Sequence, residues 1–215
     1  DALPIFLLLE KLATLYEYLT NKFQVLSISM ASSELIELRV TKPKGFKYLP
    51  GQYVMINIPQ ISKFQWHPFS FSSAPSDDYL SFHIAPAGDW TNSLKEIAKK
   101  QTIEPSLLPK VNIQGPYGAP SQHYKNYKHL MIVASGVGAT PFASILKELI
   151  GDVTKDPESH KGPIKIDFYW VNRKPSSHTW MNKLLMDIQS RDPTGKYFRL
   201  HIFFTSPHTK YDMRS

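Results

Sequence analysis

Residues 133–141, Val-Ala-Ser-Gly-Val-Gly-Ala-Thr-Pro, are the stretch that decides the fold. A near-continuous apolar run ends at Ser135, and a helical pattern of apolar residues begins at Pro141. Proline suits the first turn of a helix. Glycines let the backbone approach phosphates closely, and the free N–H groups of a helix start attract anions. A plain tight turn is the alternative, but a strand before the turn and a helix after it favour nucleotide binding. The candidate residues are Gly136, Gly138, Thr140 and Pro141.

The residues downstream extend this unit. Polar residues 151–163 predict a loop, 164–171 a strand, 179–189 a helix and 200–205 a second strand. Alternation of strand and helix is typical of a parallel sheet in a nucleotide-binding domain. Arg173 follows the second strand, where ligands of such sheets bind, and its guanidinium suits a phosphate; a solvated Arg-Lys pair is the alternative.

The residues upstream of Gly118 have a different period. Residues 36–40, 54–58 and 80–84 alternate between apolar and polar positions, with proline- and glycine-containing turns between them, which predicts a small antiparallel β-barrel. A short helix follows, with Ser93 and Glu96 as a possible capping box. Residues 4–22 form a further helical stripe, which either packs on its own domain or connects to a preceding membrane segment.

Three segments of the barrel half carry further candidates, each with an ordinary structural alternative. Residues 67–75, His-Pro-Phe-Ser-Phe-Ser-Ser-Ala-Pro, offer hydroxyls and an aromatic face to a ligand, although on composition alone a core strand explains them better. Gly88-Asp89-Trp90-Thr91 starts a helix whose N-terminus can face a pyrophosphate; equally, Trp90 only packs the helix on the barrel and Thr91 only caps it. Gly115-Pro116-Tyr117-Gly118 is either a boundary turn or a close approach to a ligand.

The composition limits the class of protein. The 215 residues contain 42% hydrophobic and 13% aromatic residues, which fits a folded globular chain. The absence of cysteine excludes disulfides and cysteine-based metal sites, and no metal is expected. The net charge of +7 is spread along the chain, so nucleic-acid binding is not expected. The longest apolar run, residues 3–9, is too short to span a bilayer.

Taken in order, these segments resemble the ferredoxin-NADP reductase superfamily and, within it, the dehydrogenase domain of the NADPH oxidases. The resemblance covers essentially the whole chain. It is carried by residues 4–6, 49–53, 67–75, 88–91, 115–118, 136–144 and 168–173, and by Thr205-Ser206 followed by Asp212.

The resemblance implies an FAD-binding β-barrel followed by a Rossmann-like NADPH-binding α/β domain. His67, Pro68, Phe69 and Ser70 would line the flavin, with Ser70 as the catalytic candidate near the reactive ring nitrogen and Ser73 among the binding residues. Trp90 and Thr91 would lie at the pyrophosphate. Gly136, Gly138 and Thr140, with Pro141, would cradle the NADPH phosphates, and Arg173 would meet the 2′-phosphate.

The implied reaction is transfer of a hydride from NADPH to FAD, followed by single-electron transfer to haem in a separate transmembrane domain. It would support superoxide or hydrogen peroxide production at the cytosolic face of a membrane, with regulatory domains or subunits as further partners. The expected organisation is a connector helix over 1–22, the FAD-binding barrel over 23–122 and an incomplete NADPH-binding domain over 123–215.

Two departures from the family pattern leave alternatives open. The family has a basic residue after His83-Ile84, where this chain has Ala85, so a phosphate contact is expected to be missing unless His83 faces the ligand. The family also continues beyond Ser215 with a strand, a helix and another strand. The alternatives are a ferric-chelate reductase module and a non-catalytic flavin-binding regulatory domain.

Overall fold

A computed structural model describes residue 12 and residues 22–101, 108–155 and 162–206. The expected helix over 4–22 and Asp212 fall outside these residues, except for Leu12, which is helical and exposed, and Lys22, which is not helical. The elements in chain order are β1 (Val25–Ser32), β2 (Leu35–Thr41), β3 (Tyr53–Asn57), β4 (His67–Ser70), β5 (Tyr79–Ile84), α2 (Asp89–Gln101), β6 (Asn112–Tyr117), the 3₁₀ helix η1 (Pro120–Asn126), β7 (His129–Ser135), the 3₁₀ turn η2 (Gly136–Ala139), α3 (Thr140–Lys155), β8 (Lys165–Asn172), the 3₁₀ helix η3 (Pro175–Met181), α4 (Asn182–Arg191) and β9 (Phe198–Phe204).

The first half is antiparallel, as expected, but the described strands do not close into one continuous barrel. They form two three-stranded sheets, in the orders β1-β2-β5 and β4-β3-β6. The chain joins them beyond the end of β4, where the Ser72 N–H donates to the Ser81 carbonyl at 2.9 Å. Alternating apolar residues of both sheets fill the core between them, including Ile36, Val54 and Phe82, all fully buried.

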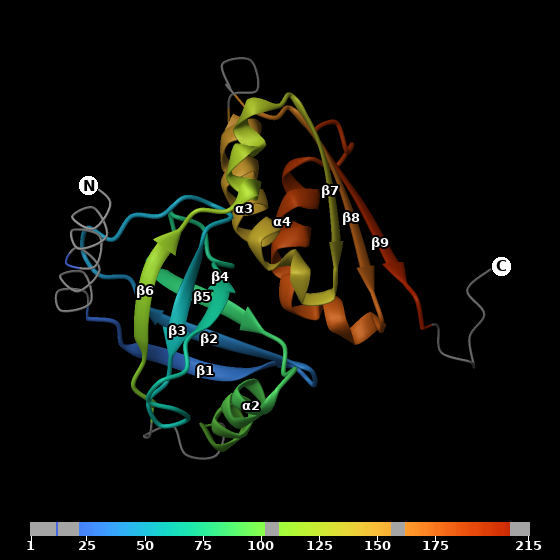
Figure 1. The fold of residues 1–215 in the computed structure, drawn as a ribbon. Helices are drawn as coiled ribbons and strands as arrows, with labels where there is room; N and C mark the ends of the chain where they lie inside the picture. The colour runs from blue at the N-terminus through green and yellow to red at the C-terminus, as the bar shows by residue number, and fades with distance from the viewer. Residues whose placement is uncertain (1–11, 13–21, 102–107, 156–161, 207–215) are drawn as a thin grey trace, which may run out of the picture.

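The second half confirms the predicted parallel α/β arrangement. Strands β7, β8 and β9 are parallel neighbours in that order, and their carboxyl ends lie at one edge (Figure 1). Helices α3 and α4 cover the face of this sheet that is turned toward the first half (Figure 1). The core of this half lies between these helices and the inward face of β8, which contributes Ile166, Phe168 and Trp170.

Several local predictions differ from the structure. The loop predicted over residues 151–163 begins too early, because helix α3 continues to Lys155. The helix predicted from residue 179 begins as the 3₁₀ segment η3 and becomes α-helical only at Asn182. The capping box at Ser93 and Glu96 is wrong, because α2 begins at Asp89 and Glu96 pairs with Lys99 instead.

The near-continuous apolar run that ends at Ser135 forms strand β7, but this strand is buried on one face only. Met131 is 73% exposed and Val133 is 63% exposed, because no described helix covers the outer face. The domain boundaries at 22/23 and 122/123 stay predictions, although the architecture changes between β6 and β7.

Candidate functional site

The glycine turn is held from two sides by side chains of its own domain. The indole Nε1 of Trp170 donates to the Gly136 carbonyl at 2.9 Å, and the Thr140 hydroxyl donates to the Val137 carbonyl. Gly136 has a φ of 51°, the left-handed region that a glycine adopts without strain. A Cβ atom at Gly136 or Gly138 would meet no other atom within 4 Å. The outer side of the turn is therefore open to a ligand, at the N-terminus of α3.

Arg173 lies directly after β8, at the same edge of the sheet as the glycine turn. Ser135 of β7 and Val171 of β8 are register partners. The glycine turn begins one residue after Ser135, and Arg173 follows Val171 by two residues, so both lie at the ends of neighbouring strands. The Arg173 carbonyl accepts from the Ser206 N–H at 3.0 Å, and its side chain is exposed. Among the described residues Arg173 has no ion-pair partner, whereas Lys174 pairs with Glu34 at 3.1 Å. Arg173 is thus a cation available to a ligand at this edge.

Strand β4 presents the second group of candidates. Ser70 pairs with Tyr53 of β3 and is half-buried, Pro68 is exposed, and Phe69 packs against the core. The His67 ring lies 4.5 Å from the Trp90 ring of α2, and the Phe69 ring lies 6.0 Å from it. The strand and the helix start therefore meet in one aromatic cluster.

This cluster contains two polar atoms that need a partner. His67 Nε2 and Trp90 Nε1 are buried and form no hydrogen bond in the described structure. Buried polar atoms are nearly always paired, because leaving one unpaired costs roughly 1–3 kcal/mol. A ring-bearing, polar cofactor such as a flavin nucleotide fits this donor set. Trp90 is only 5% exposed, so it also fixes α2 to the antiparallel half, which was the alternative to ligand binding.

Thr91 organises the start of α2. Its hydroxyl oxygen accepts from the N–H groups of Ala87 at 2.8 Å and Gly88 at 3.0 Å, and the hydroxyl donates to the Gly88 carbonyl. This side chain is therefore occupied by its own turn. The group that remains for a pyrophosphate is the backbone of the first helical turn, whose N–H groups have no intrahelical partner.

Ser73 lies in the interior rather than on the surface. It is fully buried, its hydroxyl is 2.9 Å from the Tyr48 hydroxyl, and it accepts from the Ser81 N–H at 3.1 Å. These contacts hold the segment after β4 against β5. A role of Ser73 in cofactor binding stays a prediction, and the structure gives its hydroxyl a structural one.

His83 joins the two halves, which the sequence did not reveal. Its Nδ1 lies 2.8 Å from the Ser72 hydroxyl, and its ring lies 4.3 Å from the ring of Trp180 in η3. Burial, with the nearby charges of Lys147 and Arg39, lowers the pKa of His83 to about 3. His83 is therefore a neutral residue of the interface at physiological pH.

A cavity of about 790 Å³ surrounds this contact, between sheet β1-β2-β5 and helices α3 and α4. Its lining includes Arg39 and Tyr79 from the first half and Lys147 and Leu184 from the second. Lys147 crosses the cavity to Asp77 at 3.1 Å. The interdomain residues escaped sequence reasoning because a contact between distant segments leaves no local pattern.

Comparison with known proteins gives the family. Residues 20–121 match the FAD-binding domain model FAD_binding_8, and residues 127–215 match the ferric reductase NAD-binding domain model. Respiratory burst oxidase homolog protein D of Arabidopsis thaliana is 37% identical over 99% of this chain and 26% of its own length. Protein B of Solanum tuberosum is 36% identical over 89% of the chain and 25% of its own length. The chain thus spans about a quarter of the curated relatives it matches.

Solved structures show the same fold at low identity. A ferredoxin-NADP⁺ reductase from Plasmodium falciparum with 2′P-AMP has a TM-score of 0.65 at 20% identity, covering 87% of this chain and 74% of that one. One from Neisseria gonorrhoeae with bound FAD and NADP has a TM-score of 0.63 at 18% identity, covering 88% and 71%. No helix among the described residues is both long and apolar enough to cross a bilayer. The chain belongs to the NADPH oxidase family, as an FAD-binding and NAD-binding reductase module of the ferredoxin-NADP reductase fold.

Proposed function

We propose that this chain is the part of a membrane oxidase that takes a hydride from NADPH onto FAD and passes electrons singly to haem in a separate transmembrane domain, so that superoxide or hydrogen peroxide is formed from oxygen. The observation that carries the proposal is the open glycine turn beside Arg173, which pairs with no carboxylate of the described residues. In the same described structure, the β4–α2 cluster holds two buried polar atoms without a hydrogen bond. The relatives named respiratory burst oxidases support the reaction class.

The residues of β4 and α2 would hold the flavin. FAD, when bound, supplies the chemistry of accepting a hydride and releasing electrons one at a time. Ser70 is half-buried on β4 and would place its hydroxyl at the reactive edge of the ring, while His67 and Trp90 would satisfy their free nitrogen atoms on it. The backbone N–H groups of the first turn of α2 would face the pyrophosphate.

The glycine edge would hold NADPH. Gly136 and Gly138 leave space for the phosphates, Thr140 holds the turn closed, and Pro141 lies in the first turn of α3. The guanidinium of Arg173 matches a 2′-phosphate in a bidentate geometry, which favours NADPH over NADH. The related reductase solved with 2′P-AMP supports a nucleotide carrying that phosphate.

The electron acceptor of this module is inferred from the family. A haem-bearing membrane domain, and regulatory domains or subunits, would accompany the module at the cytosolic face of a membrane. The match of residues 127–215 to a ferric reductase NAD-binding model keeps a ferric-chelate reductase as the second candidate. Ferric-chelate reduction by the full oxidoreductase, without oxygen consumption, would favour that alternative.

The first test is an FAD titration of the purified chain, followed by anaerobic addition of NADPH or NADH while the visible flavin band is recorded. Saturable FAD binding and faster bleaching by NADPH are expected. A chain that is folded by circular dichroism but binds no FAD would contradict the reductase proposal, whereas FAD binding without reduction by either nucleotide would favour the non-catalytic flavin-binding role.

A further inference from the structure

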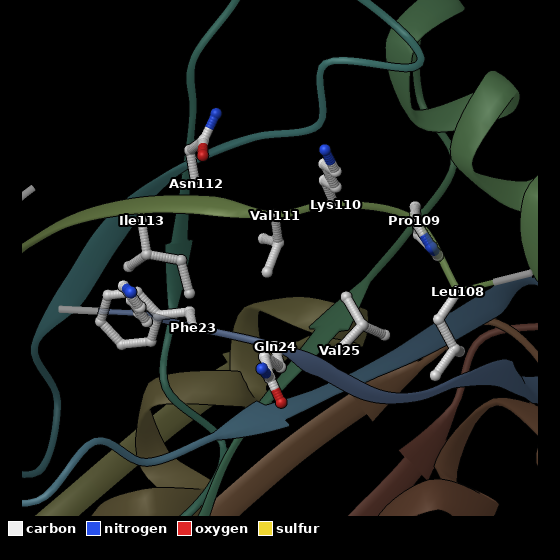
Figure 2. A pocket seen from close by; sticks show the side chains of 10 residues that line it. Phe23, Gln24, Val25, Leu108, Pro109, Lys110, Val111, Asn112 and Ile113 are labelled. Carbon is white, nitrogen blue, oxygen red and sulfur yellow. The ribbon is translucent and has the colours of Figure 1, made fainter. Parts of the chain in front are cut away.

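One corner of the β-domain combines exposed cations with an apolar hollow. The corner consists of residues 22–25 at the start of β1, the β3–β4 loop residues 62–65, and residues 108–113 leading into β6. Between the first and third segments lies a cavity of about 640 Å³. Figure 2 shows Val111 and Ile113 pointing from one side of β6 toward Phe23 and Val25, with Lys110 and Asn112 on the other side.

The corner is positively charged and has no counter-charge of its own. Lys22, Lys63 and Lys110 are all exposed, and the three segments contain no aspartate or glutamate. None of these lysines forms an ion pair within the described parts of the chain, whereas Lys99, Lys147 and Lys174 do. Among the described residues, the positive charge of the corner is therefore not neutralised by its own segments, which favours contact with anions.

The corner also carries an exposed aromatic side chain. Phe64 is 89% exposed, the highest value among the large hydrophobic residues that the structure describes, and Leu108 at the cavity is 41% exposed. These exposed groups are available to insert into a partner surface. An aromatic ring flanked by lysine is the combination found where proteins meet the headgroup layer of a bilayer.

The loop that carries Phe64 is fixed rather than loose. The amide of the buried Asn57 donates to the carbonyls of Ser62 and Gln65, both at 2.8 Å, and its oxygen accepts from Asn112 at 2.9 Å. One buried side chain thus ties the loop to β6, which lines the cavity. The loop that carries the exposed ring and the segment that lines the cavity are consequently held together.

We infer that this corner docks on an anionic phospholipid surface, with Phe64 inserted at the headgroup level and the three lysines against the lipid phosphates and serine carboxylates. The inference deepens the proposed membrane-linked function. The loop leads straight into His67 of β4, so docking here would bring the candidate flavin strand to the membrane side of the module. Apolar insertion and electrostatic attraction add together in such docking.

The test uses the FAD-treated chain and sedimentation with phosphatidylcholine vesicles, with or without phosphatidylserine. Binding is expected only with phosphatidylserine and is expected to weaken with salt. Lys63→Gln and Lys110→Gln should each weaken it roughly fivefold, and Phe64→Ser about tenfold. The matched controls Lys165→Gln and Met131→Ser, on the outer face of the parallel sheet, should leave it unchanged.

A site-specific readout is possible because the chain contains no cysteine. A Phe64→Cys variant labelled with an environment-sensitive dye should brighten on anionic vesicles, while a labelled Met131→Cys variant should not. Equal losses in corner and control variants, equal binding to neutral vesicles, or self-association abolished by Phe64→Ser would each overturn the inference. FAD titration of the same samples separates the proposals: FAD binding without vesicle binding defeats only the docking surface, and vesicle binding without FAD binding defeats the reductase.

Discussion

The ring of His83, on β5, lies 4.3 Å from the ring of Trp180, on η3, with the two planes inclined by 35°. This contact joins the antiparallel half to the parallel half. Because Ser72 lies 2.8 Å from His83 and only two residues after Ser70, the contact also connects the interface to the candidate flavin strand. The position of the nucleotide-binding half therefore depends on a residue of the flavin half.

Replacement of His83 by alanine should slow flavin reduction by NADPH while leaving FAD affinity nearly unchanged. An aromatic pair contributes about 0.5–1.5 kcal/mol beyond its buried area, so a loss of roughly twofold to tenfold in rate is expected. His83→Phe keeps a ring against Trp180 and should recover most of the rate. Stopped-flow reduction provides the measurement, and an equal rate in the alanine variant would show that the contact does not position the halves.

The stability of the chain should depend on His83 between pH 6.5 and pH 3. Its folded pKa of about 3 lies below the ordinary value near 6.5, so the unfolded chain binds the additional proton first. Stability is full above about pH 6.5 and falls as the pH drops, by up to about 4–5 kcal/mol. Glu37 and Arg39 from β2 and Lys147 from α3 surround the ring. Urea unfolding of His83→Phe should show a shallower decline; parallel curves would contradict this origin.

The two glycines of the turn should respond differently to alanine. Gly136→Ala places a side chain at a φ of 51°, which should lower the unfolding free energy by about 1–2 kcal/mol. Gly138 is not in that region and a Cβ there meets open space, so Gly138→Ala should fold normally yet weaken NADPH binding. Thermal melts and nucleotide titrations give the two readouts. Unchanged affinity in Gly138→Ala would remove that glycine from the phosphate site.

Arg173→Gln should reduce the preference for NADPH over NADH by at least about tenfold, because a bidentate charged contact to the 2′-phosphate is lost. The reduction rate at low concentrations of each nucleotide measures the preference. Lys174→Gln is the matched control, since Lys174 already pairs with Glu34. A preference that changes in Lys174→Gln but not in Arg173→Gln would show that Lys174, and not Arg173, contacts the 2′-phosphate.

Ser70→Ala should lower the rate of flavin reduction by roughly tenfold to a hundredfold, within the range that a positioned hydrogen bond contributes to catalysis. Ser70→Thr keeps the hydroxyl and should retain more of the rate. FAD affinity should change little in either variant, because the neighbouring His67 and Trp90 remain. A rate that is the same in all three proteins would remove Ser70 from the reacting centre.

The sequence was informative where a pattern is local. The glycine turn, strands β2, β5, β7 and β8, and the helix after the turn follow from periodicity and from glycine and proline positions. Strand β1 lacks clear alternation because its pairing with β2 shifts register twice. The sequence did not predict the contacts of the Ser73 hydroxyl or of the His83 ring, because the direction of a side chain depends on which distant segment packs against it. Trp170, which braces Gly136, was recognised only as a strand residue for the same reason.

The junction between the two halves contains the His83–Trp180 ring contact and two ion pairs beside it. Ionic strength affects the ion pairs more than the ring contact. Lys174–Glu34 is more than half exposed on both sides, and Lys147–Asp77 is about a quarter to a third exposed. Counterions screen such pairs over about 8 Å at physiological ionic strength, but they barely affect the ring contact. The two halves are thus joined by one ring contact that salt leaves nearly unchanged and by two ion pairs that salt weakens, so high ionic strength should loosen their association.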